Sequence, residues 1–160
     1  PIVSGAVAQT DTRFGKAADF ISRITAITGR APITTIADAE PIGPQRLLDI
    51  LVVAPCTGNT LAKLANGITD TSVTMACKAQ LRNLSPLLIA LSTNDGLSAN
   101  APNLGAMLNR RHVYFVPFGQ DDPQKKVHSL TADLEKLPEA LHAALEGNQL
   151  QPLLSPAFAR

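Results

Sequence analysis

The sequence has few aromatic residues and almost no net charge. It has no Trp, one Tyr and five Phe in 160 residues, so we expect a core of Leu, Ile, Val and Ala. The net charge is +1, and no run of Lys or Arg exceeds two residues. This balance disfavours a nucleic-acid partner or an acidic membrane surface. No apolar run reaches transmembrane length, and no signal-peptide pattern is visible. We therefore expect one cytoplasmic globular domain.

Cysteine and histidine are also sparse. Cys56 and Cys77 lie in separate predicted elements without CxxC spacing, which is typical of reduced thiols in a cytosolic protein. Cys56 has no neighbouring His that would activate it as a nucleophile, so a structural thiol is favoured. The three His residues lack ligand spacing, and we expect no metal site. No residue stands out as catalytic.

Nucleotide-binding signatures are absent. The chain has neither GxGxxG nor a Walker sequence, which disfavours an ordinary dinucleotide-binding domain or phosphotransferase unless an upstream segment carries the motif. The sequence starts at Pro1 without Met, and residues 2–7 already have a strand pattern. We expect the gene product to contain an upstream unit that is absent here.

Apolar patterning predicts strands that alternate with helices. Strands are expected at 2–7, 49–54, 87–91 and 113–117, with a short strand or turn at 33–37. Helices are expected at 16–28, 61–68, 71–81, 104–110 and from Ser129 to Leu145. In the last helix, Leu130, Leu134, Leu137, Leu141 and Leu145 should face inward, and Pro138 should produce a kink. The two strongest strands are continuous apolar runs, which favours an α/β fold with a mostly parallel sheet. One domain should cover 1–151, followed by an extended tail at 152–160.

Polar residues follow the predicted strands. In open α/β sheets, ligands bind beyond the carboxyl ends of the strands, which selects residues 4–5, 56–60, 92–95 and 118–122. Hydroxyls, amides and a helix N-terminus suit a small polar or anionic ligand, most often a phosphate. The same residue types are common helix caps and turn formers. The pattern alone leaves both interpretations open.

Two basic residues are candidates for binding a carboxylate. Arg13 lies in the first polar loop and Lys78 on a predicted helix. A guanidinium can bind a carboxylate through two hydrogen bonds. A solvated surface position is an equally good interpretation of each.

Residues 54–70, APCTGNTLAKLANGITD, resemble the signature loop and helix of the homo-oligomeric FMN-binding flavoproteins. That family includes cysteine-peptide decarboxylases, phosphopantothenoylcysteine decarboxylase and prenyl-flavin synthases. The resemblance extends over nearly the whole chain to one subfamily, the B subunits of dipicolinate synthase. The segments that carry it are 12–15, 39–44, 91–95, 114–123 and 150–152.

The resemblance implies a Rossmann-like three-layer sandwich whose first strand–helix unit is missing here. It implies FMN contacts at eight positions: Ser4, Thr57, Gly58, Asn59, Thr60, Ser92, Thr93 and Asn94. It also implies a homo-oligomer, a trimer or larger, with sites between protomers. The A subunit of dipicolinate synthase would be the partner and would bring the nicotinamide cofactor, NADP. The implied reaction oxidises dihydrodipicolinate to dipicolinate in the mother cell of a sporulating bacterium, with Arg13 and Lys78 as candidate contacts for the dicarboxylate.

Departures from the family pattern bear on the chemistry. The decarboxylases place a His before the strand at 49–54, where this chain has residues 40–44 without His. Their PxMN motif is replaced by residues 92–95, and the Arg of prenyl-flavin synthases by Ser92. We therefore expect a component of an oxidoreductase. The alternatives are an FMN-dependent decarboxylase and a non-catalytic, flavin-carrying protein that supports the A subunit.

Overall fold

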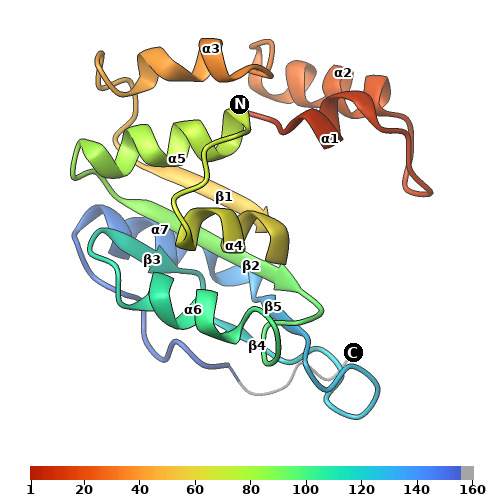
Figure 1. Ribbon diagram of the computed structural model, residues 1–160, viewed down its shortest axis with the longest axis vertical. Helices are drawn as coiled ribbons and strands as arrows, with labels where there is room; N and C mark the ends of the chain where they lie inside the picture. The colour runs from red at the N-terminus through yellow and green to blue at the C-terminus, as the bar shows by residue number, and fades with distance from the viewer. Residues whose placement is uncertain (156–160) are drawn as a thin grey trace.

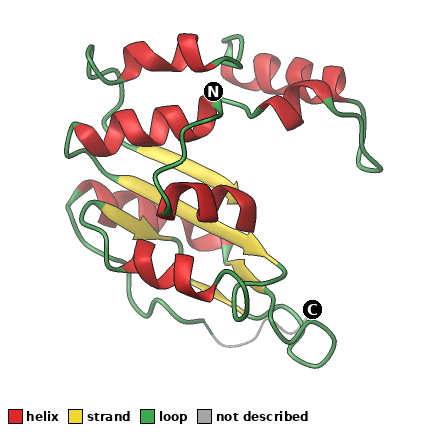
Figure 2. Cartoon of the chain, viewed as in Figure 1, coloured by secondary structure: helices red, strands yellow, loops and turns green. Residues whose placement is uncertain are grey.

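The computed structural model describes residues 1–155 of the chain (Figures 1 and 2). Helices come before the first strand, and strands separated by helices follow from residue 51 to residue 115. In chain order the elements are α1 (Gly5–Gln9), α2 (Ala17–Thr28), α3 (Ile36–Ala39), the short 3-10 helix η1 (Glu40–Ile42), β1 (Leu51–Cys56), α4 (Gly58–Ala65), α5 (Ser72–Arg82), β2 (Leu87–Thr93), α6 (Ala101–Leu108), β3 (Val113–Phe115), β4 (Phe118–Gly119), β5 (Leu130–Ala132), the 3-10 helix η2 (Leu134–Lys136) and α7 (Leu137–Leu145).

Three parallel strands form the centre of the sheet. β2 pairs with β1 on one side and with β3 on the other, both in parallel. Beyond the end of β3, the last residues of β2 pair in antiparallel fashion with β5, which pairs in turn with β4. The sheet is therefore mostly parallel, with a small antiparallel extension beside the carboxyl end of β2.

Helices cover both faces of this sheet. α4, α5 and α6 lie on the near face in Figure 1, and α7 lies behind β2 and β3. Residues 87–91 of β2 are fully buried, as expected of a strand covered on both sides. The structure confirms the predicted α/β fold and its three-layer, Rossmann-like architecture.

The N-terminal segment is a helix where the sequence predicted a strand. Only Ile2 is paired, by a single parallel bridge to Ile33, and α1 begins at Gly5. Ser4 caps this helix, because its hydroxyl accepts a hydrogen bond from the Val7 amide. A serine followed by glycine favours such a cap over extended pairing. The strand predicted at 2–7 is therefore wrong beyond its first residues.

The helix predicted from Ser129 is also wrong in its first part. Residues 130–132 form β5, and α7 begins only at Leu137. Pro138 occupies the first turn of α7, where no N–H is needed, so it starts the helix and does not kink it. Leu134 and Leu145 are 60% and 45% exposed and do not face inward.

The tail is extended where it is described. Leu154 forms a parallel bridge with Phe118, and the Ser155 amide donates to the Phe118 carbonyl at 2.9 Å. Residues 156–160 of the predicted tail lie outside the described residues. Within residues 1–155, no helix is both long and apolar enough to cross a membrane.

Candidate functional site

The candidate site lies at the carboxyl ends of β1 and β2. Cys56 is in register with Leu91, so Thr57 and Ser92 follow on adjacent strands. Around them, the side chains of Thr57, Asn59, Ser92 and Asn94 are exposed. The structure therefore brings the two central predicted segments together at one edge of the sheet.

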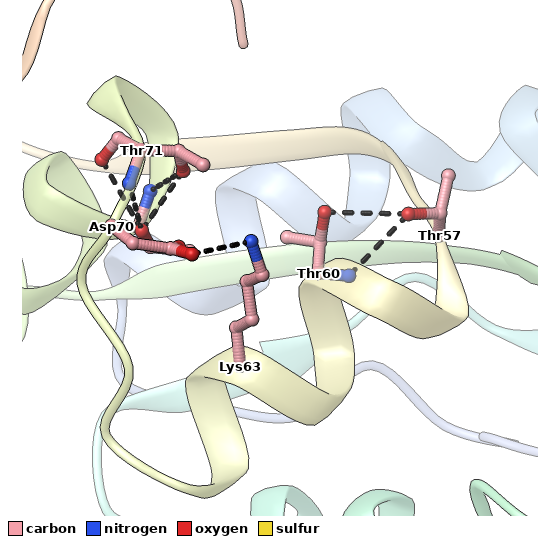
Figure 3. Close-up of polar contacts among 6 residues, drawn as sticks. Thr57, Thr60, Lys63, Asp70 and Thr71 are labelled. Carbon is pink, nitrogen blue, oxygen red and sulfur yellow. Dashed lines mark hydrogen bonds and ion pairs between the residues drawn. The ribbon is translucent and has the colours of Figure 1, made fainter. Parts of the chain in front are cut away.

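Helix α4 begins at this edge with almost no loop. Thr57 is its N-cap, and its hydroxyl accepts a hydrogen bond from the Thr60 amide at 3.4 Å and lies 3.3 Å from the Thr60 hydroxyl (Figure 3). The amides of the first turn have no partner within the helix, and they carry its positive dipole end. Hydroxyls and amides at this position suit an anionic group such as a phosphate.

Gly58 allows the start of α4 to approach β2 closely. A Cβ at Gly58 would lie 2.5 Å from the Thr93 hydroxyl oxygen, 2.7 Å from Asn100 Nδ2 and 2.8 Å from Asp95 Oδ1. These separations are too short for any side chain. Gly58, predicted to contact the ligand, thus also has a structural role: it places the Thr57 cap directly beside the end of β2.

Asp95 organises the polar residues behind Gly58. The Thr93 hydroxyl donates to its carboxylate, and Asn100 Nδ2 donates to Oδ2 at 2.8 Å. The amide chain continues from Asn103 to Asn100 at 2.9 Å and from Asn66 to Asn103 at 3.2 Å. The hydrogen bonds from Thr93 and then Asn100 lower the pKa of Asp95. An ionised carboxylate with its acceptors occupied orients its neighbours and is a poor proton acceptor.

Ser129 supports the same edge from β5. It is buried, and its hydroxyl lies 3.2 Å from the Thr93 carbonyl oxygen and 3.3 Å from Asn94 Oδ1. It therefore links Asn94 to the sheet while leaving that side chain exposed. Ser129 was expected to begin a helix and Asn100 had no expected role, because nothing in the linear pattern places either residue beside β2.

The two charged residues of the signature segment pair with each other. Lys63 Nζ lies 2.8 Å from Asp70 Oδ2, joining α4 to the residue before the Thr71 cap of α5 (Figure 3). The hydrogen bond from Lys63 is the main cause of the lowered pKa of Asp70. This exposed pair links α4 to the segment that leads into α5.

Ser4 and Arg13 lie on the N-terminal segment. Ser4 is next to Val3, whose carbonyl accepts from the Ser72 hydroxyl at 2.6 Å, so Ser4 sits beside the start of α5. Arg13 is exposed in the hairpin between α1 and α2, with its guanidinium carbon 4.7 Å from the centre of the Phe14 ring. Figure 1 shows this hairpin extending away from the sheet. No hydrogen bond joins either side chain to Thr57 or Ser92 within residues 1–155.

Lys78 lies elsewhere. It lines a surface cavity together with Leu84, which precedes β2, and His112, which precedes β3. Those residues mark the amino ends of the strands, at the opposite edge of the sheet from Thr57 and Ser92. The structure therefore does not bring Lys78 together with the other predicted contacts.

Both cysteines are buried free thiols. Burial raises the pKa of Cys56 to about 12, and it likewise raises the pKa of Cys77 to about 12. A protonated, inaccessible thiol cannot act as a nucleophile, in agreement with the structural role expected of Cys56. In the described part of the chain, no three His, Cys, Asp or Glu side chains cluster as metal ligands would.

Comparison with known proteins matches this fold and most of the sequence. The model of the flavoprotein family matches residues 7–125. The B subunit of dipicolinate synthase from Bacillus subtilis (strain 168) is 46% identical over 154 residues, which are 96% of this chain and 77% of that protein.

Solved structures give the same result. The crystal structure of the dipicolinate synthase B subunit from Bacillus halodurans superimposes with a TM-score of 0.90 at 45% identity, covering 99% of this chain and 81% of that one. An FMN-dependent cysteine decarboxylase, SpaF, shares the fold with a TM-score of 0.62 at 23% identity, covering 91% and 76% of the two chains.

Proposed function

The chain belongs to the flavoprotein family, and on that basis we propose that it binds FMN and acts as the B subunit of a dipicolinate synthase. The similarity to two dipicolinate synthase B subunits, over 96% and 99% of the chain, supports the assignment. The main observation in favour of a binding site is the exposed polar edge at the ends of β1 and β2. Gly58 allows the start of α4 to approach the end of β2 closely at this edge.

The residues at this edge fit a flavin nucleotide. Thr57, Asn59 and the first turn of α4 offer hydroxyl, amide and N–H donors for a phosphate, and Ser92 and Asn94 offer donors and acceptors for ring heteroatoms. The one acidic side chain of the cluster, Asp95, has its oxygens occupied by Thr93 and Asn100. These bonds direct its oxygens toward Thr93 and Asn100, but both donors are neutral, so Asp95 keeps its negative charge.

The proposed reaction is a two-electron oxidation. Dihydrodipicolinate would lose two electrons and two protons to become the aromatic dipicolinate, and FMN, when bound, would supply the electron acceptor. The A subunit would bring NADP. In this proposal the chain itself binds and orients. Thr57, Asn59 and Thr60 hold the phosphate end, and Ser92 and Asn94 face the ring. Thr93, also predicted to contact the ring, has its hydroxyl bonded to Asp95 and supports these two neighbours.

Two contacts lie outside this edge. Ser4 and Arg13 sit on the N-terminal segment, and in the proposal they complete the site in a homo-oligomer, a trimer or larger, where protomers meet. Arg13 then binds a substrate carboxylate. Arg13→Ala should raise KM for the dicarboxylate and leave FMN affinity unchanged, whereas unchanged kinetics would remove Arg13 from the site.

Reconstitution with the partner tests the function. The A subunit from the same genome is assayed for dipicolinate formation on its own, with this protein, and with this protein plus FMN. The proposal predicts that the full rate needs both this protein and FMN. Full activity of the isolated A subunit would overturn the catalytic assignment, and release of carbon dioxide from the substrate would identify a decarboxylase.

A further inference from the structure

A basic cavity of about 450 Å³ lies at the opposite edge of the sheet from the proposed flavin site. It is formed where α5 ends, where the chain turns after α6, and where β3 is about to begin. Its lining residues are Lys78, Leu81, Arg82, Leu84, Arg110, Arg111 and His112. A smaller cavity of about 160 Å³ adjoins it and shares Lys78, Leu81 and Arg110.

The charged side chains that line this cavity are all basic. One Lys and three Arg line it, and no acidic residue lines either cavity. None of these cations is ion-paired within residues 1–155, where the three ion pairs involve Lys63, Lys126 and Lys136. The whole chain carries a net charge of only +1. The positive charge is thus a local feature and does not reflect a generally basic surface.

Helix dipoles explain only part of this arrangement. α5 and α6 both end here, and a helix C-terminus carries roughly half a negative charge. Two such ends offset about one of the four permanent positive charges. An excess of about three positive charges therefore remains at this exposed surface, with no carboxylate among the lining residues to compete with an anion.

The cavity is lined by basic side chains, two of which are restrained by their neighbours, and by apolar side chains. Arg110 is held in place, because its Nη1 donates to the Leu64 carbonyl of α4 at 3.2 Å. Arg82 is confined on one side, since a Cβ at Gly43 would lie 3.4 Å from its Nη2. Leu81 adds apolar wall, and Leu84 is 70% exposed at the rim. An inorganic ion would use the arginines and leave the leucines in water.

We propose that this cavity binds a small organic dianion with a flat apolar frame, such as an aromatic dicarboxylate. The carboxylates pair with Arg82, Arg110 and Arg111, since guanidinium groups bind carboxylates through paired hydrogen bonds. The apolar frame lies against Leu81 and Leu84. The identification of dipicolinate as the natural ligand rests on the proposed function. The existence of an anion-binding site here does not.

The cavity is separate from the proposed flavin site. The two are joined by the seven residues of β2, a distance of about 20 Å at the usual rise of a strand. A dicarboxylate bound here would therefore occupy a second site, and its binding would not depend on FMN.

Calorimetric titration of the FMN-free protein with isophthalate, a flat dianion outside the proposed reaction, tests this site. Dipicolinate, benzoate and inorganic phosphate are titrated in parallel. The test variant is Arg82→Gln combined with Arg111→Gln, both exposed side chains. The matched control is Arg23→Gln, an exposed residue of α2.

The proposal predicts that isophthalate and dipicolinate bind the wild type and the control, and that the double variant binds them about tenfold more weakly or worse, as loss of charge-assisted hydrogen bonds implies. Benzoate and phosphate should bind less tightly than the two dicarboxylates. Equal affinity in the double variant, or phosphate binding as tight as that of isophthalate, would overturn it. Failure to bind FMN would instead contradict the proposed function and leave these titrations unchanged.

Discussion

Gly58 and Thr93 lie so close together that a Cβ on Gly58 would come within 2.5 Å of the Thr93 hydroxyl oxygen. This contact joins the start of α4 to the end of β2. It sets the spacing between the two polar segments of the proposed flavin site, Thr57 to Thr60 on one side and Ser92 to Asn94 on the other. The geometry of the proposed flavin site depends on this close approach.

Gly58→Ala should therefore disrupt the site. The added methyl group would collide with Thr93, Asn100 and Asp95, which are hydrogen-bonded to one another and cannot simply turn away. Overpacking of this kind costs about 1–3 kcal/mol. Urea unfolding should show that loss, and FMN titration should show weaker binding. The control is Gly105→Ala, within α6, where a Cβ meets nothing within 4 Å; it should stabilise the protein by up to about 1 kcal/mol.

Thr57→Ala should weaken FMN binding more than it weakens the fold. The variant loses an N-cap, which costs about 1 kcal/mol of stability, and a hydroxyl assigned to the phosphate, which should lower FMN affinity about tenfold. Fluorescence titration of FMN measures the second effect. Thr57→Ser keeps the hydroxyl and should retain the affinity. Equal FMN affinity of the Ala and Ser variants would remove Thr57 from the phosphate site.

Acid should destabilise the protein through Asp95. Its hydrogen bonds hold its pKa below the ordinary value, so it binds a proton more readily in the unfolded chain than in the fold. Its contribution to stability is present above the unfolded pKa of about 4 and is lost as the pH falls below that value through the folded pKa. Asp121, whose pKa is lowered chiefly by its hydrogen bond with Lys126, acts in the same direction.

Thermal unfolding between about pH 6 and pH 3 measures this effect. Asp95→Asn should lower the melting temperature at pH 6 and flatten its fall toward pH 3, because the variant has no carboxylate to protonate. Asp49→Asn is the control: Asp49 is an exposed residue before β1 and makes no side-chain hydrogen bond within residues 1–155. A slope as steep in Asp95→Asn as in the wild type would contradict the role given to this network.

The two thiols should be unreactive in the folded protein. Both are buried, and burial raises the pKa of each to about 12. A colorimetric thiol reagent at mildly alkaline pH should detect almost no thiol in the native protein and two per chain in denaturant. Rapid labelling of one thiol in the native protein would show that Cys56 is accessible and would reopen its interpretation as a nucleophile.

Local signals predicted the central elements well. The apolar run that became β2 is buried on both faces at residues 87–91, whereas β1 is only partly buried, with Ala54 and Pro55 exposed. Continuous apolar runs of this kind have few alternative explanations. The helix predicted at 71–81 is present, and Thr71 caps it with a reciprocal hydrogen bond to Thr74. The helix predicted at 16–28 ends at Gly29, whose φ is 66°. These features depend on residues near one another in the chain.

The errors come from long-range packing. Residues 130–132 follow a leucine spacing that fits a helix, yet they pair with the end of β2 and with β4. The position of Lys78 on the far edge of the sheet depends on how α5 crosses β1 and β2, which no local pattern records. The same holds for Asn100 and Ser129. Asn100, at the start of α6, bonds to Asp95 just after β2, and Ser129 bonds to the carbonyl of Thr93 in β2.

Hydrogen–deuterium exchange of the protein with and without FMN locates the flavin on the chain. We expect FMN to slow exchange of the backbone amides at 57–60 and 92–94 and to leave the α5–α6 edge around Arg82 and Arg111 unchanged. Unchanged exchange at both polar segments in the presence of saturating FMN would contradict the proposed flavin site.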